Sequence, residues 1–195
     1  MRAMRRLVLV ALLAAGCAAG LGGPSATRAP GYRGAEVRRP ALTVRLAFGP
    51  GDFSKQERQQ FPEVYTTALL DALNAQAVVP VDLQVTTGTL DRAAALARAR
   101  DLGADQAVIV EATVGRGLRT YCRDSRRMFT TRVTGVVSRV DVVRAADGQT
   151  RLVEPEVEAS DFEEDCDAPK ESRRLSADEL IADSVRKVLA KVLGP

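Results

Sequence analysis

The stretch Leu102-Gly103-Ala104-Asp105-Gln106-Ala107-Val108-Ile109-Val110 decides the fold class. Residues 90–102 at its start are rich in alanine and have helical spacing, and Gly103 stands where a helix ends in a left-handed residue. Residues 107–110 are apolar without alternation, which is typical of a central strand covered on both faces. Helix, glycine cap and buried strand in this order predict an α/β unit.

Elements before and after this stretch extend the unit. Alternating apolar residues predict a strand over 42–48, and a second strand is predicted over 78–85. Between them a capping box, Ser54 with Glu57, precedes a helix with apolar residues from 61 to 73. This helix begins either at the capping box or at Pro62, a residue that suits the first turn.

The second half of the chain predicts a hairpin and a last helix. Asp147-Gly148 is a turn signal between two alternating runs, and symmetric pairing about it places Val140 opposite Pro155. A bulge is expected within residues 135–139. A second capping box at Ser176 begins a terminal helix. The predicted fold is α/β (α+β), a mixed β-sheet with about three helices in the order β-α-β-α-β-β-β-α, forming one domain over residues 42–195.

Residues 1–16 have the pattern of a secretory signal. Three arginines precede the apolar run 7–15, which is too short to span a bilayer permanently. The run ends in Leu13-Ala14-Ala15-Gly16-Cys17, which resembles the lipobox of bacterial lipoproteins, although Ala14 stands where that family prefers leucine. The resemblance implies that Cys17 is acylated, as with palmitate, and becomes the first mature residue. The alternatives are an ordinary signal peptide cleaved nearby and an apolar start that arises by chance.

The residues after the signal predict a tether. Gly and Pro are frequent over 17–41 and no apolar period is present, so this stretch is predicted to be flexible. Its basic residues are either a solvated linker, which we favour, or contacts to anionic lipid headgroups; they are Arg28, Arg33, Arg38 and Arg39. Residue 18 is Ala rather than Asp, which resembles the signal for transfer to the outer membrane, so the expected location is the periplasmic face of that membrane.

Composition argues against several functions. Without the three arginines of residues 1–16, the 28 basic residues fall to 25, equal to the 25 acidic ones, and this balance gives no support for a nucleic-acid partner. Histidine is absent and Trp is absent, which removes the commonest general base and metal ligand and the strongest stacking side chain. No catalytic triad, nucleophile elbow or phosphate loop is present. The sequence therefore predicts a protein that is not an enzyme and needs no cofactor and no metal.

The remaining cysteines form an even pair. If Cys17 carries lipid, Cys122 and Cys166 lie in an exported, oxidising compartment, where pairing is the default expectation. We predict a disulfide between them; the alternative is two separate thiols.

Opposite charges gather around these two cysteines. Residues 116–139 are rich in arginine and residues 154–167 are rich in acids. Mutual pairing in solvent is the reading we favour, ahead of a surface that recognises a partner; calcium binding by the acids is a third reading, without EF-hand spacing. The residues of the candidate partner surface are Arg119, Arg123, Arg126, Arg127, Glu163, Glu164 and Asp165.

The stretch 102–110, the segment Val140-Asp141-Val142-Val143 and the turn Asp147-Gly148 resemble a known group. It is the periplasmic α/β domain shared by the TolB N-terminal domain, the activator lipoprotein LpoB and the curli-secretion lipoprotein CsgG. The resemblance covers residues 42–193 and implies an accessory or assembly lipoprotein that binds another envelope protein. The alternative is a structural subunit of an envelope or secretion complex, a homo-oligomer formed through the hairpin or the edge at Pro80.

Overall fold

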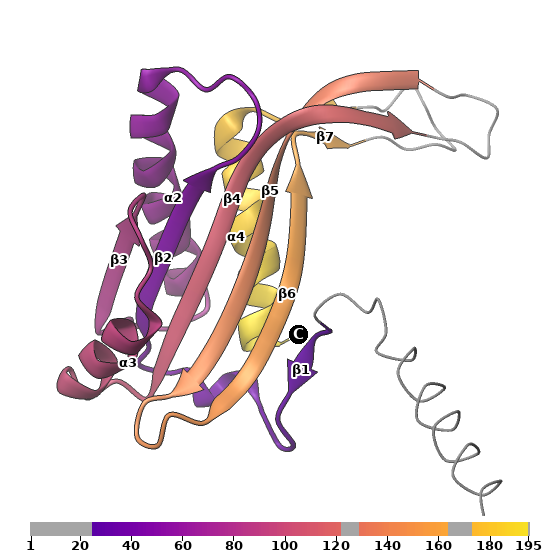
Figure 1. Cartoon of the computed structure of the whole chain (residues 1–195). Helices are drawn as coiled ribbons and strands as arrows, with labels where there is room; N and C mark the ends of the chain where they lie inside the picture. Colours follow the sequence, from indigo (N-terminus) through magenta and orange to yellow (C-terminus); the bar gives the residue numbers. More distant parts are fainter. Residues whose placement is uncertain (1–24, 122–128, 164–172, 195) are drawn as a thin grey trace, which may run out of the picture.

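The computed structural model describes residues 25–121, 129–163 and 173–194 (Figure 1). Their elements, in chain order, are β1 (Thr27–Arg28), η1 (Gly34–Glu36), β2 (Ala41–Phe48), α2 (Lys55–Ala75), β3 (Asp82–Thr86), α3 (Arg92–Asp101), β4 (Gln106–Tyr121), β5 (Phe129–Arg144), β6 (Thr150–Ser160), β7 (Phe162–Glu163), β8 (Arg173–Arg174) and α4 (Ala177–Leu193).

Six strands form one mixed sheet in the order β1-β6-β5-β4-β2-β3. Strand β2 is parallel to both β3 and β4, whereas the β4–β5, β5–β6 and β1–β6 pairs are antiparallel. Strands β7 and β8 form a separate two-stranded sheet. The predicted α/β class, the mixed sheet and the order of its main elements are confirmed.

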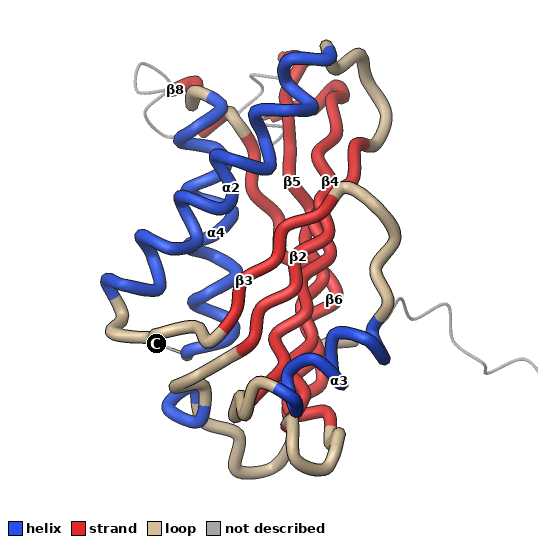
Figure 2. The backbone as a smooth tube through the Cα atoms, turned by 90° about the vertical axis from the view of Figure 1, so that its left-hand side faces the viewer, coloured by secondary structure: helices blue, strands red, loops and turns tan. Residues whose placement is uncertain are grey.

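The strand order explains why the helices lie on both faces of the sheet. The chain moves from β2 outward to β3 through α2, then back past β2 to β4 through α3. Because parallel crossovers are right-handed, connections that run in opposite directions place their helices on opposite faces. Figure 2 shows α2 and α4 on one side of the sheet and α3 on the other.

The main core lies between the sheet and the helix pair α2 and α4. Val44 of β2 and Val110 of β4 alternate toward this side, as expected for strands. Tyr65 and Leu69 of α2 and Val185 of α4 meet them from the helix side, all fully buried. On the other face α3 covers only a small cluster of alanines, which are Ala41, Ala99, Ala104, Ala107 and Ala145.

Helix α2 begins at its capping box and not at Pro62. The Ser54 hydroxyl accepts from the Glu57 amide at 3.2 Å, and the Ser54 amide donates to a Glu57 carboxylate oxygen at 2.7 Å. Pro62 lies inside the continuous helix. The missing amide hydrogen bond at Pro62 is tolerated because Phe61 and Tyr65 on either side of it are buried in the core.

The hairpin is present, but its predicted register is wrong by one residue at Val140–Val142 and by two at Val143, where a second register shift lies nearer the turn. Val140 lies opposite Glu154 instead of Pro155. A register shift lies between Ser138 and Val140, at the edge of the predicted bulge, and the extra residue belongs to β6. Pro155 explains this placement, since proline has no amide to donate to the strand ladder and is found at such irregularities.

Much of the stretch that the sequence predicts to be a flexible tether packs on the domain. Strand β1 pairs with Leu152 and Val153 of β6. Tyr32 and Val37 are buried, and the Tyr32 hydroxyl donates to the Val192 carbonyl of α4 at 2.5 Å. The prediction of a flexible stretch over 17–41 is therefore wrong for the residues from 27 onward. Burial of the Tyr32 and Val37 side chains stabilises the packed segment despite the Gly and Pro content that suggested an unfolded one.

Candidate functional site

Strands β4 and β5 continue beyond the rest of the sheet as a two-stranded ribbon, residues 116–121 with 129–134, called the ribbon below. Strand β2 pairs with β4 only as far as Val114, and β6 pairs with β5 only from Gly135. Figure 1 shows the ribbon leaving the top of the sheet, with β7 beneath it. The ribbon is the part of the described chain that projects furthest from the core.

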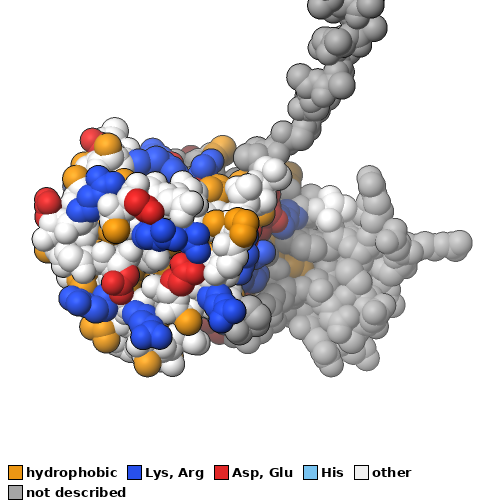
Figure 3. Space-filling model, turned by 90° about the horizontal axis from the view of Figure 1, so that it is seen from below, with side chains coloured by type: hydrophobic (Ala, Val, Ile, Leu, Met, Phe, Trp, Pro, Cys, Tyr) orange, Lys and Arg blue, Asp and Glu red, His pale blue; other side chains and the backbone are white. Residues whose placement is uncertain are grey.

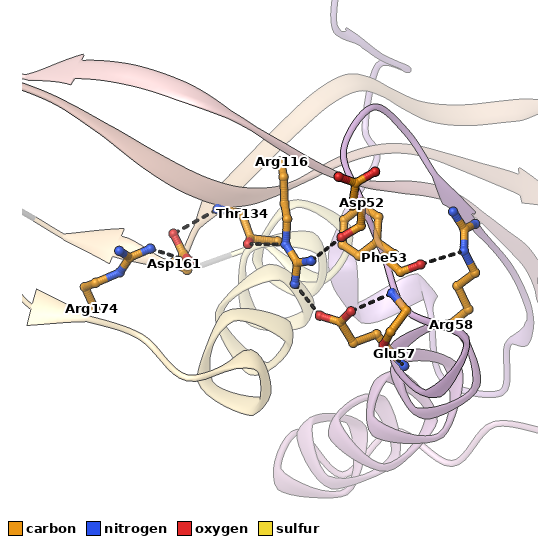
Figure 4. Close-up of polar contacts among 9 residues, drawn as sticks. Asp52, Phe53, Glu57, Arg58, Arg116, Thr134, Asp161 and Arg174 are labelled. Carbon is orange, nitrogen blue, oxygen red and sulfur yellow. Dashed lines mark hydrogen bonds and ion pairs between the residues drawn. The ribbon is translucent and has the colours of Figure 1, made fainter.

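Arg116 holds the base of the ribbon to helix α2 (Figure 4). Its guanidinium forms an ion pair with Glu57 and donates to the Asp52 carbonyl at 2.5 Å and to the Thr134 hydroxyl at 3.3 Å. Its Cζ also lies 4.4 Å from the centre of the Phe53 ring, a cation–π arrangement. One side chain thus connects β4, β5, the loop before α2 and the first turn of α2.

The loop before α2 approaches β4 closely because of glycine. The Arg116 amide donates to the Pro50 carbonyl at 2.8 Å. Gly51 has a φ of +112°, and a Cβ there would lie 2.7 Å from the Arg116 Cβ. A side chain at this position would push the loop off the strand, so the Gly-Pro-Gly sequence that ends β2 also positions Arg116.

A second polar contact holds the β5 side of the ribbon. The Thr134 amide donates to Asp161 at 3.0 Å, and Arg174 forms an ion pair with the same carboxylate at 3.3 Å while donating to the Arg132 carbonyl at 2.9 Å. A hollow of about 440 Å³ lies among these groups, and its lining residues are Asp52, Arg116, Arg132, Val133, Thr134, Asp161 and Arg174.

The electrostatics of this site favour structure and binding over proton transfer. The hydrogen bond from Arg116, with two more from Ser54, lowers the pKa of Glu57 to about 2. Glu57 is therefore ionised at neutral pH and is no proton donor there. Within residues 25–121, 129–163 and 173–194, no group of three or more His, Cys, Asp or Glu is arranged to hold a metal ion.

A second surface lies between α2 and α4. The groove there has a volume of about 710 Å³ and a floor of small apolar residues, with acids at its rim. Its lining residues are Glu63, Val64, Thr67, Ala68, Asp71, Ala72, Asp178 and Ala182.

Two members of the candidate partner surface fall within the described chain. Arg119 is exposed on the ribbon, and its guanidinium lies 3.4 Å from Glu158. The backbone of Glu163 pairs with Arg173 in the small sheet. The Arg119–Glu158 pair is an instance of the mutual pairing favoured by the sequence. The other residues with predicted roles lie outside the described residues, and they are Cys17, Cys122, Arg123, Arg126, Arg127, Glu164, Asp165 and Cys166.

Sequence reasoning missed the network that positions the ribbon. The Ser54 capping box identified Glu57 as a helix cap, but not its second role as the partner of Arg116. Arg116 is separated from Glu57 by 59 residues, so no local pattern joins them. The one available sequence signal for Arg116 was its position between Gly115 and Gly117, since glycines within a strand mark a bend or a close approach of another segment.

No helix in the described part of the chain is both long and apolar enough to cross a membrane.

The comparisons with known proteins return similar folds at low identity. No family model matches the sequence, and the search of curated proteins returns no match. A PelC dodecamer from Paraburkholderia phytofirmans is 15% identical, with a TM-score of 0.38, covering 88% of this chain and 94% of that one. Lipoprotein GNA1162 from Neisseria meningitidis is 13% identical, with a TM-score of 0.37, covering 63% and 82%. A minor lipoprotein from Acinetobacter baumannii is 10% identical, with a TM-score of 0.33, covering 76% and 91%. Because these scores are low, the function proposed below rests on the chain's own residues.

Proposed function

We propose that this chain is a non-enzymatic lipoprotein of the bacterial envelope that binds another envelope protein through its ribbon. Lipid on Cys17 anchors it to the membrane, on the periplasmic face of the outer membrane. The signal segment and its cysteine support the anchor, and the ribbon is the observation that supports the binding role.

The ribbon has the features of a binding element. A two-stranded ribbon in water is marginally stable by itself, yet this one is held at its base by Arg116 and Asp161. Leu118 on the ribbon is 73% exposed, which gives an apolar contact on the same face as its cross-strand neighbour, the exposed Arg132. Beyond Arg116, whose amide donates to Pro50, the outer edge of β4 also presents backbone groups with which an added strand of a partner can pair.

The ribbon lies far from the end of the chain that leads to the anchor. Strand β1 pairs with Leu152, which shares a row of the sheet with Val142 and Val108. Arg116 lies eight positions after Val108 in β4, a distance of about 27 Å along a strand. This separation supports a ribbon that points away from the membrane, toward a partner.

A second candidate function is a structural subunit that associates with copies of itself through the edge of the sheet. Strand β3 supports this alternative, because it is the outer strand of the sheet and, within the described chain, pairs with β2 alone. Pro80 lies before β3 and not within it, so it does not block pairing along Asp82–Thr86. A dimer or larger species of the purified protein, lost on Gln84→Pro, is the expected sign of this alternative.

Photocrosslinking in cells tests the leading proposal. A photoreactive residue at Leu118 is expected to join the protein to one defined envelope protein. The matched control is Val79, which is 68% exposed and lies in the connection before β3. Equal crosslinking from both positions, or only self-crosslinks from Leu118, contradicts the proposal.

Membrane fractionation tests the anchor separately. Cys17→Ser is expected to release the protein from the membrane fraction, since no other lipid attachment is proposed. An unchanged membrane fraction would show that Cys17 is not the anchor.

A further inference from the structure

The segment that leads to the anchor crosses one end of the domain, called the lower end below, which consists of residues 27–40, the end of α3 and the β5–β6 turn. The Asp105 amide donates to the Arg39 carbonyl at 3.1 Å, and Ala145 at the turn bonds to Asp105 in the same way. Gly34 of η1 lies against the Leu193 backbone at the end of α4. Residues far apart in the sequence are therefore brought together at this end.

Arginines without a carboxylate partner gather at the lower end. Three other arginines there are neutralised by ion pairs, namely Arg98 with Asp82, Arg144 with Asp147 and Arg151 with Glu36. Among the described residues of this end, five arginines have no ion pair, and they are Arg28, Arg33, Arg38, Arg39 and Arg100. Of the acids that the structure describes at this end, Asp101 and Asp105 have no ion pair. Figure 3, seen from this end, shows Lys and Arg side chains spread across the surface, with fewer acids between them.

The length of chain outside the structure fixes how far this surface can lie from the anchor. Ser25, the first described residue, lies eight positions after Cys17. A flexible chain of this length has a root-mean-square reach of about 16 Å, and a fully extended one reaches about 28 Å. The 24-residue tether expected from the sequence would have had a reach of about 25–30 Å as a coil. The attachment of residues 27–41 therefore brings the domain close to the membrane.

We infer that the lower end is a docking surface for anionic lipid headgroups, so that the anchored domain lies on the membrane in one orientation, with the ribbon outward. Exposed arginines are attracted to anionic lipid within about one screening length of the surface, about 8–10 Å at physiological salt. The short tether makes this encounter intramolecular, and a weak attraction is then sufficient. The inference rests on the proposed lipid anchor and adds the orientation and the lipid class.

Fluorescence quenching in vesicles tests this orientation with the lipidated full-length protein. The chain has no Trp, so Ala35→Trp in η1 and Leu118→Trp on the ribbon each give a single probe. The vesicles are phosphatidylcholine with or without phosphatidylglycerol, and both contain a headgroup-labelled quencher lipid. Quenching of Ala35→Trp is expected only with phosphatidylglycerol and is lost near 1 M salt, where the screening length is about 3 Å. Leu118→Trp is expected to remain unquenched.

Two double variants of equal charge change separate the lower end from general electrostatics. In R33Q/R39Q the ratio of docked to undocked domain is expected to fall about thirtyfold. In R119Q/R132Q, which changes two ribbon arginines, the ratio is expected to stay the same. Three results would each overturn the inference. They are equal quenching of Ala35→Trp in neutral and anionic vesicles, an equal fall of the docked ratio in both double variants, and quenching of Leu118→Trp. Flotation with neutral vesicles reports the lipid anchor alone, so a failed anchor and a failed orientation give different results.

Discussion

Arg116 of β4 and Glu57 of α2 form an ion pair that joins the base of the ribbon to the first turn of a helix. The other Glu57 oxygen accepts from the Ser54 amide, so the same carboxylate caps the helix and holds the ribbon. The direction in which the ribbon leaves the sheet therefore depends on how α2 begins.

Arg116→Gln is expected to lower the free energy of unfolding by about 1–3 kcal/mol, because it leaves the Glu57 carboxylate and the Asp52 carbonyl without their donor. Urea unfolding measures this loss. The matched control is Arg119→Gln, whose exposed pair with Glu158 is worth about 0–1 kcal/mol. Equal losses in the two variants would show that the Arg116 network does not stabilise the fold.

The stability of the domain is expected to fall between about pH 4.5 and pH 2 through Glu57. The pKa of Glu57 lies near 2 in the folded protein because of the Arg116 hydrogen bond, and near 4.5 without it. A lowered pKa stabilises the folded state above the unfolded value, and this contribution is lost as the pH falls through the folded value. Urea midpoints measured from pH 5 downward should fall less steeply for Glu57→Gln than for the wild type. Parallel curves would contradict this assignment.

Tyr32→Ala is expected to release the segment before β2. The variant removes a buried ring, the hydrogen bond to Val192 and the surface on which Arg28 stacks at 5.2 Å. Hydrogen exchange should accelerate in residues 27–37 and stay unchanged in β4 and β5. Tyr32→Phe, which keeps the ring and removes only the hydroxyl, should give a smaller effect of about 1 kcal/mol. Unchanged hydrogen exchange in residues 27–37 of the Tyr32→Ala variant would contradict the role of Tyr32 in holding this segment on the domain.

A disulfide between Cys122 and Cys166 is expected to stabilise the exported protein by about 4 kcal/mol, because it closes a loop of about 45 residues in the unfolded chain. Mass analysis without reductant should find the two peptides joined. Alkylation of both thiols in the exported protein is the opposite result. The double variant with serine at both positions should show the loss of stability without any change in net charge.

Local patterns predicted the elements well and their long-range relations poorly. The Ser54 and Ser176 capping boxes, the strand at Ala107–Val110 and the turn at Asp147-Gly148 all depend on residues close in sequence, and each is present in the structure. The register near Val140 was wrong because a single proline in β6 shifts the pairing. The length of the flexible tether was overestimated, because Gly and Pro content gives no sign that the Tyr32 hydroxyl bonds to α4.

The sequence by itself determined the α/β class, because this class follows from composition and short-range spacing, and on the same grounds it predicts a signal segment that ends at Cys17. Only the tertiary structure decided which charges meet. It joined Arg116 to Glu57 across 59 residues, and it brought Arg33, Arg39 and Arg100 to one end of the domain. The physical reason is that the sheet order, fixed by right-handed crossovers and burial of the apolar strand faces, determines which side chains become neighbours.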